Sequence, residues 1–405
     1  MKKLNINIEV KKAILLGMLC AVSYFAVYIF RNVLGAVSPQ MIEKGIFNTK
    51  DIGAFSSLFF ITYACGQLIN GVIGDKIKAK YMLGFGLLLA GVSSLVFTCF
   101  CTNKSVAYIA YACSGFFLSM IFGPMTKVVA ENVDLLYVPR CSLSYEFAAL
   151  LGSPAAGLLA ALMAWGSVFM TSSVVLLVMG IVCLLVFTLF EKKGMVKFSQ
   201  YAPPAKKSSG LKLLIKHRII RFTFISIITG IVRTTVVFWL PTYISQKLGF
   251  SAEMAALIFS VVTIGISTTS FIAVFIYEKL KRNMDLTILI SFSSAAIFFV
   301  CVFFVKQPFV NVAFMMLAIM GSNCAAAMLW SRYCPSLRDT GMVSSATGFL
   351  DFVSYMSAAI SSALFANAVN SIGWDWLIVV WFALMICGII VALPSRKQQF
   401  VEIMS

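Results

Sequence analysis

The sequence has few charged residues and a single histidine, His217. Charged side chains make up 12% of its 405 residues and hydrophobic ones 60%, a balance that a water-soluble globular chain of this length does not need. The 11 cysteines form no CxxC pair, which argues against metal, disulfide and redox sites. No nucleophile is paired with a base, and no glycine-rich nucleotide loop is present. We therefore expect no metal, no cofactor and no enzymatic activity.

Apolar stretches of about 20 residues recur along the chain, and each is long enough to cross a hydrocarbon core of roughly 30 Å as a helix. The stretches are continuous rather than alternating, so they predict helices and not a β-barrel. The fold class that follows is an all-α membrane protein with twelve transmembrane helices. The expected spans are 13–37, 52–74, 81–100, 105–126, 141–163, 168–190, 219–243, 254–277, 284–305, 308–330, 341–364 and 374–393.

Acidic residues are scarce, 15 against 32 lysines and arginines, which gives a net charge of +17. If both termini are cytoplasmic, the inside segments hold 25 of the 32 basic residues and the outside loops five, as the positive-inside rule demands. This location explains the charge without a nucleic-acid partner. We expect a monomeric, multi-pass protein in the lipid bilayer of the inner (plasma) membrane, with both termini cytoplasmic.

The two halves of the chain repeat each other. Arg31 of the first span and Arg233 of the seventh each precede a proline by eight residues and lie 202 residues apart. Asp75 after the second span and Glu278 after the eighth are each followed by lysine and lie 203 residues apart. The repeat predicts two pseudo-symmetric six-helix halves with the substrate site between them near the membrane midplane.

A Lys- and Ser-rich segment over 191–218 separates six spans from six, and its composition is typical of a solvated cytoplasmic linker. The expected organisation is therefore an N-terminal half over 1–190, a basic linker over 191–218 and a C-terminal half over 219–405.

Arg31 and Arg233 lie within predicted spans, where a charged side chain costs several kcal/mol and is a functional hypothesis by default. Two planar guanidinium groups across a cavity suit a doubly charged tetrahedral anion, because each can donate two parallel hydrogen bonds. Tyr24 and Tyr28 precede Arg31 by seven and three residues, so they share its helix face and can add hydroxyl donors. The alternative is that each arginine is a structural ion-pair partner or extends to the membrane interface.

On the seventh span, Ser226 and Thr229 precede Arg233 by seven and four residues, which places them on its helix face as the counterpart of the two tyrosines. Two acidic residues also fall in predicted spans, Glu146 in the fifth and Asp351 in the eleventh, at an offset of 205 residues. In a low dielectric they can hold protons and couple transport to them, or contact a cationic part of the cargo. A structural role, holding the arginines in place, is the third possibility.

Gly71, Asp75, Lys76 and Lys80 follow the spacing G-x-x-x-D-[RK]-x-x-x-[RK] between the second and third spans. This resembles the signature of the major facilitator superfamily. Asp75 can bond to a helix terminus or a basic partner, so we assign Gly71, Asp75 and Lys76 to a conformational latch rather than to binding.

Further residues resemble one branch of that superfamily, the organophosphate:phosphate antiporters, which include glycerol-3-phosphate and hexose-phosphate transporters. The likeness runs through nearly the whole chain and is carried by Tyr24, Tyr28, Arg31 and Pro39, the segment Gly71–Lys80, Gly123-Pro124 with Lys127, Arg233 with Trp239-Leu240-Pro241-Thr242-Tyr243, and Gly373-Trp374-Asp375.

The resemblance implies that Arg31 and Arg233 bind phosphate, that Tyr24 and Tyr28 line the cavity, and that inorganic phosphate is exchanged for a small organic phosphate by alternating access. The sequence departs from the glycerol-phosphate members at Gln67, where those have lysine. Two alternatives stay open: a proton-coupled symporter of organic anions, and a transporter-like sensor of hexose phosphate.

Overall fold

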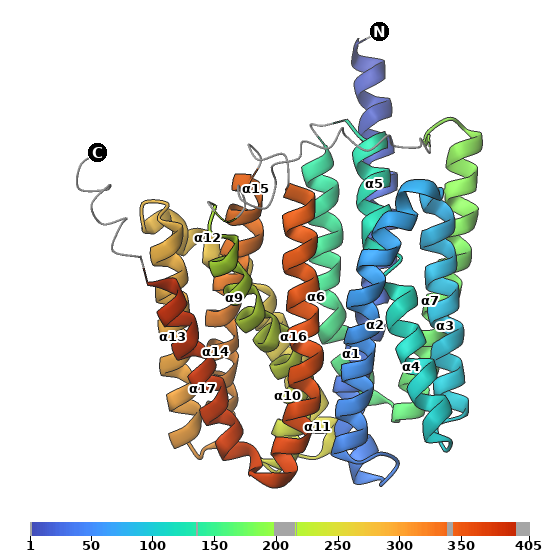
Figure 1. The fold of residues 1–405 in the computed structure, drawn as a ribbon. Coiled ribbons are helices and arrows are strands. Elements are labelled where there is room, and N and C mark those ends of the chain that lie inside the picture. Colours follow the sequence, from blue (N-terminus) through green and yellow to red (C-terminus); the bar gives the residue numbers. More distant parts are fainter. Residues whose placement is uncertain (1, 135–136, 198–214, 216, 338–342, 394–405) are drawn as a thin grey trace, which may run out of the picture. The chain divides into compact units, whose positions relative to one another are not determined.

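A computed structural model gives the structure of the protein and describes residues 2–134, 137–197, 215, 217–337 and 343–393 (Figure 1). Helices and short connections account for all of these residues, and no strand occurs among them. Inter-helix contacts divide the chain into two compact units, Met1–Ala205 with Leu240–Ile264 and Lys206–Trp239 with Gly265–Ser405. Most of the expected linker, 198–214 and 216, lies outside the described residues, and the division into halves at the linker stays a prediction.

The first unit contains nine helical segments in whole or in large part: α1 (Lys2–Glu43), α2 (Thr49–Lys76), α3 (Ala79–Cys99), α4 (Lys104–Leu118), α5 (Phe122–Asn132), α6 (Val138–Leu162), α7 (Trp165–Lys192), α10 (Val237–Gln246) and α11 (Ala252–Ser267). The second unit contains α9 (Ile219–Gly230), the π-helical η1 (Ile231–Val236), α12 (Thr269–Lys279), α13 (Met284–Phe304), α14 (Pro308–Met328), the π-helical η2 (Leu329–Tyr333), α15 (Cys334–Ser336), α16 (Val343–Ser371) and α17 (Gly373–Ala392).

Each of the twelve expected spans coincides with one helix or with consecutive helical segments. In the described residues, eleven helices are long and apolar enough to cross a membrane, and the fifth span contributes the shorter apolar stretch Phe147–Leu162. Large apolar side chains such as Leu162, Phe271 and Phe304 are exposed on the helix surfaces, as lipid contact requires. The chain is therefore a multi-pass membrane protein.

Several helices begin at a side chain that caps their first turn. Asn48 and Asp51 form a reciprocal pair at the start of α2, with the Asp51 amide donating to Asn48 Oδ1 at 2.8 Å. Asn103, Asn283 and Gln307 accept from a backbone amide three residues further on in α4, α13 and α14. Such caps satisfy amide donors that have no partner within the helix. They fix where the spans start after the short loops.

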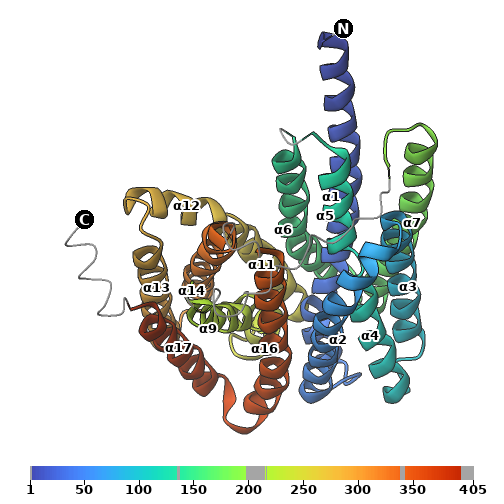
Figure 2. The same ribbon diagram turned by 45° about the horizontal axis from the view of Figure 1, so that its top comes forward.

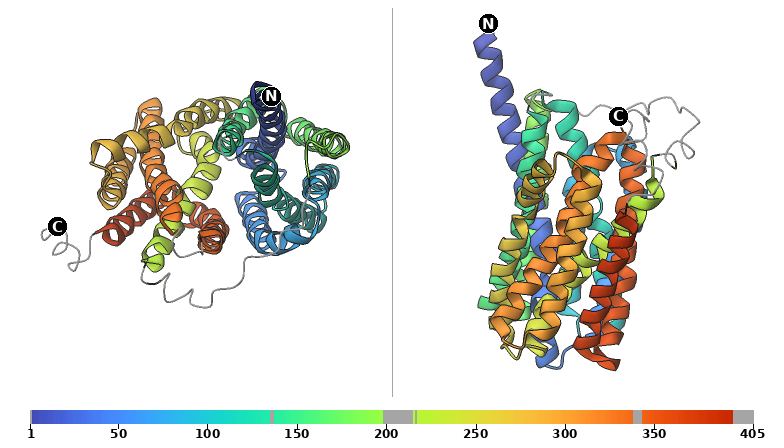
Figure 3. Two further views of the ribbon diagram at one scale, coloured as in Figure 1. Left: turned by 90° about the horizontal axis from the view of Figure 1, so that it is seen from above. Right: turned by 90° about the vertical axis from the view of Figure 1, so that its left-hand side faces the viewer.

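The same helix pairs recur in the two units. α1 packs against α6 and α3 against α7 in the first unit, just as α9 packs against α16 and α13 against α17 in the second. The pairs α2 with α4 and α12 with α14 also correspond. Figure 2 shows α9 between α14 and α16, and the right panel of Figure 3 shows α13, α14 and α17 side by side. The structure thus confirms two pseudo-symmetric six-helix halves as a pattern of packing.

Two glycines allow the arginine-bearing helices to pack closely against their partners. A Cβ on Gly152 of α6 would lie 2.7 Å from the carbonyl carbon of Tyr28 and 2.9 Å from the amide of Ile29. A Cβ on Gly230 of α9 would lie 2.8 Å from the carbonyl oxygen of Ser354 on α16. Backbone atoms cannot give way as a flexible side chain can, so both contacts require glycine.

We predict that Gly152→Ala and Gly230→Ala each lower the free energy of unfolding by about 1–3 kcal/mol, the usual range for overpacking. Gly166→Ala is the matched control, because a Cβ there meets nothing within 4 Å. Thermal unfolding of the purified variants in detergent tests this. Equal melting temperatures for all three would contradict the close-contact argument.

Candidate functional site

One face of α1 carries Tyr24, Tyr28 and Arg31. The rings of Tyr24 and Tyr28 meet edge to face with centroids 4.9 Å apart, and the Arg31 Cζ lies 5.2 Å from the centroid of Tyr28. Tyr24 is buried, while Tyr28 and Arg31 are half-buried. The structure therefore brings together the three first-span residues that the sequence singled out, and their role in binding stays a prediction.

Two rings from α2 complete an aromatic cage around Arg31. The Arg31 Cζ lies 5.5 Å from the ring centroid of Phe60 and 5.2 Å from that of Tyr63. Phe60 and Tyr63 are three residues apart, so one face of α2 presents both. Aromatic rings attract a guanidinium but carry no net charge. These ring contacts thus stabilise the Arg31 guanidinium without adding a negative charge of their own.

Tyr24 and Tyr28 of α1 are held in place by residues of α5 and α6. Tyr24 stacks on Phe122 of α5 with centroids 5.6 Å apart and meets Tyr145 of α6 edge to face at 6.2 Å. Gly152 of α6 lies against the backbone of Tyr28. Side chains locked in this way give a binding group a defined position.

Arg233 lies in the π-helical segment η1, and its Cζ is 5.9 Å from the centroid of the Trp330 ring. Trp330 itself belongs to η2, the second π-helical segment of this unit. π-Helical turns are rare, less favourable than α-helical ones and frequent at functional sites. Each arginine therefore has aromatic contacts, three rings for Arg31 and one indole for Arg233.

Ser226 and Thr229, the predicted counterpart of the two tyrosines, both bond to backbone carbonyls. The Ser226 hydroxyl donates to the Leu350 carbonyl of α16 at 2.7 Å, and the Thr229 hydroxyl donates to the Ile225 carbonyl of its own helix at 2.8 Å. Both side chains are buried. Their place on the helix face of Arg233 stays a prediction.

The two acidic candidates fall on α6 and α16. Asp351 is half-buried. Burial raises the pKa of the Cys334 thiol of α15, and the negative charge of Asp351 adds to this direction, whereas a hydrogen bond with Thr347 acts against it. The side chain of Glu146 lies outside the described residues. Coupling, cargo contact and support of the arginines therefore remain predictions for both.

The backbone of the latch candidates Gly71, Asp75 and Lys76 forms the last turns of α2, which ends at Lys76. Their side chains lie outside the described residues. Further along the signature, Lys78 and Lys80 bind the two carboxylate oxygens of Glu191 at 2.7 and 2.6 Å. The hydrogen bond to Glu191 raises the pKa of the Lys78 ammonium. These two ion pairs join the start of α3 to the end of α7.

Phe60, Tyr63 and Trp330 were missed by the sequence interpretation. The signal for the first two was their spacing of three residues in a span that follows the arginine helix. Trp330 carried no comparable signal, because its contact with Arg233 depends on two π-helical segments far apart in the chain.

Comparison with known proteins places the chain in a family. The model that describes the Major Facilitator Superfamily matches residues 20–362. The chain belongs to the Major Facilitator Superfamily. It is therefore a membrane transporter by family rather than an enzyme, and the signature around Gly71–Lys80 was a correct indication.

Similar curated proteins include a sensor and two transporters. The chain is 32% identical to the membrane sensor protein UhpC of Salmonella typhimurium over 94 residues, which are 23% of this chain and 21% of that protein. It is 21% identical to the phosphoglycerate transporter protein of Salmonella typhimurium, covering 92% of this chain and 87% of that protein. It is 20% identical to the hexuronate transporter of Bacillus subtilis, covering 85% of each.

Among solved structures, a bacterial homologue of the human lysosomal transporter Spinster superposes with a TM-score of 0.74 at 10% identity, covering 94% of this chain and 96% of that one. At this identity the likeness supports the fold alone.

Proposed function

We propose that the protein is a secondary transporter of small organic phosphates that exchanges them for inorganic phosphate by alternating access. The observation that carries the proposal is the pair of intramembrane arginines, Arg31 in its three-ring cage and Arg233 against Trp330. The likeness to the phosphoglycerate transporter over most of the chain supports the substrate class.

Phosphate suits these groups for a physical reason. A guanidinium fork donates two parallel hydrogen bonds to phosphate oxygens, and such charge-assisted bonds are stronger away from water. Aromatic rings against a guanidinium face hold its plane in a defined orientation, and the N–H donors lie in that plane. In this proposal Tyr24 and Tyr28 set the position of Arg31, while Glu146 and Asp351 support the arginines or carry protons.

The remaining assignments follow from charge and signature. The distribution of lysine and arginine favours cytoplasmic termini and the plasma membrane, with the bilayer as the surrounding partner and a monomer as the working form. Gly71, Asp75 and Lys76 act in the conformational cycle as a latch at the end of α2.

The second candidate is a proton-coupled symporter of organic carboxylates, which the likeness to the hexuronate transporter favours. A carboxylate also fits a guanidinium fork, so the same arginines serve both candidates. The short UhpC match supports a third outcome, binding without transport.

We predict that purified protein in phosphate-loaded liposomes takes up labelled phosphate, and that Arg31→Lys and Arg233→Lys each lower the exchange rate at least about tenfold. Lysine keeps the charge but loses the bidentate fork, and hydrogen bonds to charged groups contribute about 1.5–3 kcal/mol. Arg332→Lys is the matched control, because Arg332 also lies 4.8 Å from a ring, that of Tyr277, but is exposed.

Competition by phosphoglycerate, hexose phosphates and a hexuronate then identifies the cargo. Uptake of hexuronate driven by a pH gradient, with no exchange of phosphate, would replace the phosphate proposal by the symporter. Phosphate binding without flux would indicate a sensor.

We also predict that Phe60→Leu and Tyr63→Leu weaken phosphate binding by about 2- to 30-fold, because a cation–π contact contributes about 0.5–2 kcal/mol. Tyr63→Phe keeps the ring and should bind like the parent if the ring is what matters. Phe271→Leu, on an exposed side chain, is the control. Titration of the purified variants with labelled phosphate gives the dissociation constants, and unchanged values for both leucine variants would refute the cage.

A further inference from the structure

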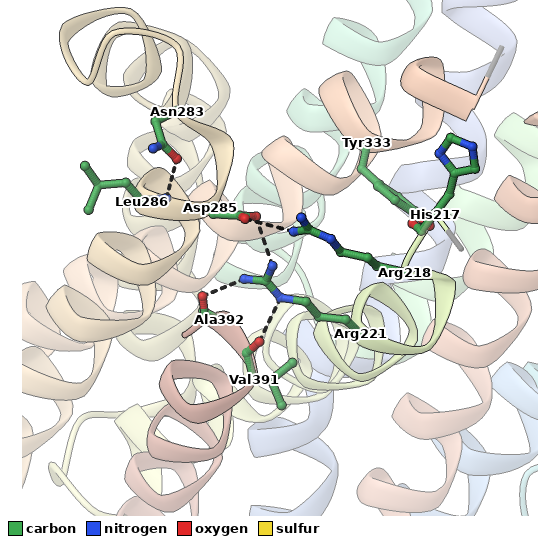
Figure 4. Close-up of polar contacts among 9 residues, drawn as sticks. All are labelled: His217, Arg218, Arg221, Asn283, Asp285, Leu286, Tyr333, Val391 and Ala392. Atoms are coloured by element: carbon green, nitrogen blue, oxygen red, sulfur yellow. Dashed lines mark hydrogen bonds and ion pairs between the residues drawn. The ribbon is translucent and has the colours of Figure 1, made fainter. Parts of the chain in front are cut away.

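A cluster of charged residues ties together three helix ends of the second unit (Figure 4). Arg221, in the first turn of α9, donates to the carbonyls of Val391 and Ala392 at 2.8 and 2.5 Å. Its Nη1 also lies 3.1 Å from Asp285 in the first turn of α13. Arg218 adds a second ion pair to Asp285, also at 3.1 Å. We call these four contacts the Arg221 clamp.

The chemistry of the Arg221 clamp fits the helix ends that it joins. Val391 and Ala392 are the last residues of α17, so their carbonyls have no amide partner further along the helix. A cation is favourable at that end, and the Asp285 carboxylate is favourable at the start of α13. The three nitrogens of Arg221 each contact one of these oxygens, an arrangement that the single nitrogen of a lysine ammonium does not reproduce.

In the first unit, ion pairs join α3 and α7, the helices that correspond to α13 and α17, and these ion pairs do not involve α1. Lys78 and Lys80 at the start of α3 bind Glu191 near the end of α7. Asp285 lies 205 residues after Lys80, so the charge at this position is reversed between the repeats. The repeat offset of 202 residues places the apolar Leu19 of α1 at the position of Arg221. Among the residues whose side chains the structure describes, a tie of this kind to the arginine-bearing span is thus found in the second unit and not in the first.

α9 leads directly to Arg233. Twelve residues separate Arg221 from Arg233, about 18 Å at the rise of an α-helix. Between them, the Ser226 hydrogen bond and the close contact at Gly230 hold α9 sideways against α16. Beyond Arg233, the Thr235 hydroxyl donates to the Ala358 carbonyl of α16 at 3.0 Å. The Arg221 clamp adds to these contacts an anchor at the start of α9, on α13 and α17 rather than on α16.

The same end of α9 is also tied to the partner of Arg233. The Tyr333 hydroxyl donates to the carbonyl of His217 at 3.0 Å, as Figure 4 shows, and its ring stacks on Phe222 with centroids 3.5 Å apart. Tyr333 is the last residue of η2, which carries Trp330. The start of α9 is therefore linked along its own helix to Arg233, and through Tyr333 to the segment that carries Trp330.

We infer that Arg221 is a positioning residue for Arg233: by fixing the axial position of α9, it sets where the π-helical segment presents the guanidinium to the anion. The identity of the anion in this inference rests on the proposed function. The mechanical link between Arg221 and η1 does not, and it can be measured without any ligand.

The test compares Arg221→Leu with Glu191→Gln, which breaks the tie in the first unit. In lipid nanodiscs, Arg221→Leu should raise the dissociation constant for inorganic phosphate about tenfold, within the usual range of coupling between sites. It should also speed amide hydrogen exchange over 219–236. Glu191→Gln should leave the phosphate constant within about twofold and affect only the ends of α3 and α7. Arg221→Lys should restore part of the affinity.

If Arg221→Leu does not fold, Asp285→Asn weakens the Arg221 clamp while keeping the bonds to α17, and should shift both readouts in the same direction by less. Faster exchange over 219–236 with unchanged phosphate affinity would overturn the inference, as would equal affinity losses in Arg221→Leu and Glu191→Gln. A parent protein that binds no phosphate would refute the proposed function instead. Hydrogen exchange would then still support or refute the link to η1.

Discussion

The structure depends on keeping a guanidinium charged within an apolar span. Arg31 is such a residue, and aromatic rings stabilise it: its Cζ lies 5.2 to 5.5 Å from the ring centroids of Tyr28, Phe60 and Tyr63. These rings stabilise the cation through their quadrupoles and add no net charge beside it.

Much else in the first unit follows from this cage. α1 and α2 must stay close enough for rings from both helices to contact the Arg31 guanidinium. Gly152 allows α6 to pack closely against the backbone of α1 at Tyr28. Tyr24, Phe122 and Tyr145 fill the space beside it. In the second unit, Arg233 lies in a π-helical segment and contacts the indole of Trp330. The two arginines are equivalent in sequence but not in their surroundings.

The sequence predicted the fold well because its strongest signals are physical requirements of the bilayer. Continuous apolar runs gave the twelve spans, and the spacing of Arg31 and Arg233 gave the repeat. Tyr24, Tyr28 and Arg31 were grouped correctly because helical periodicity decides which neighbours share a face. The same rule groups Ser226 and Thr229 with Arg233, but it assumes an α-helical period and Arg233 lies in a π-helical segment, so that grouping stays a prediction. Phe60 and Tyr63 left only the signal of their spacing, and Trp330 depends on a contact between two π-helical segments that no local pattern encodes.

One feature of the fold limits how independent the two repeats are. The segment Leu240–Ile264 follows the linker in sequence but belongs to the first compact unit. There, Ser38 of α1 shares a hydrogen bond of 2.6 Å with Thr242 of α10, and the Ser260 hydroxyl of α11 donates to the Pro154 carbonyl of α6. A chain cut at the linker would leave its N-terminal fragment without these two segments. The six-helix repeats are therefore not separate modules, because the first compact unit includes residues that follow the linker in the chain.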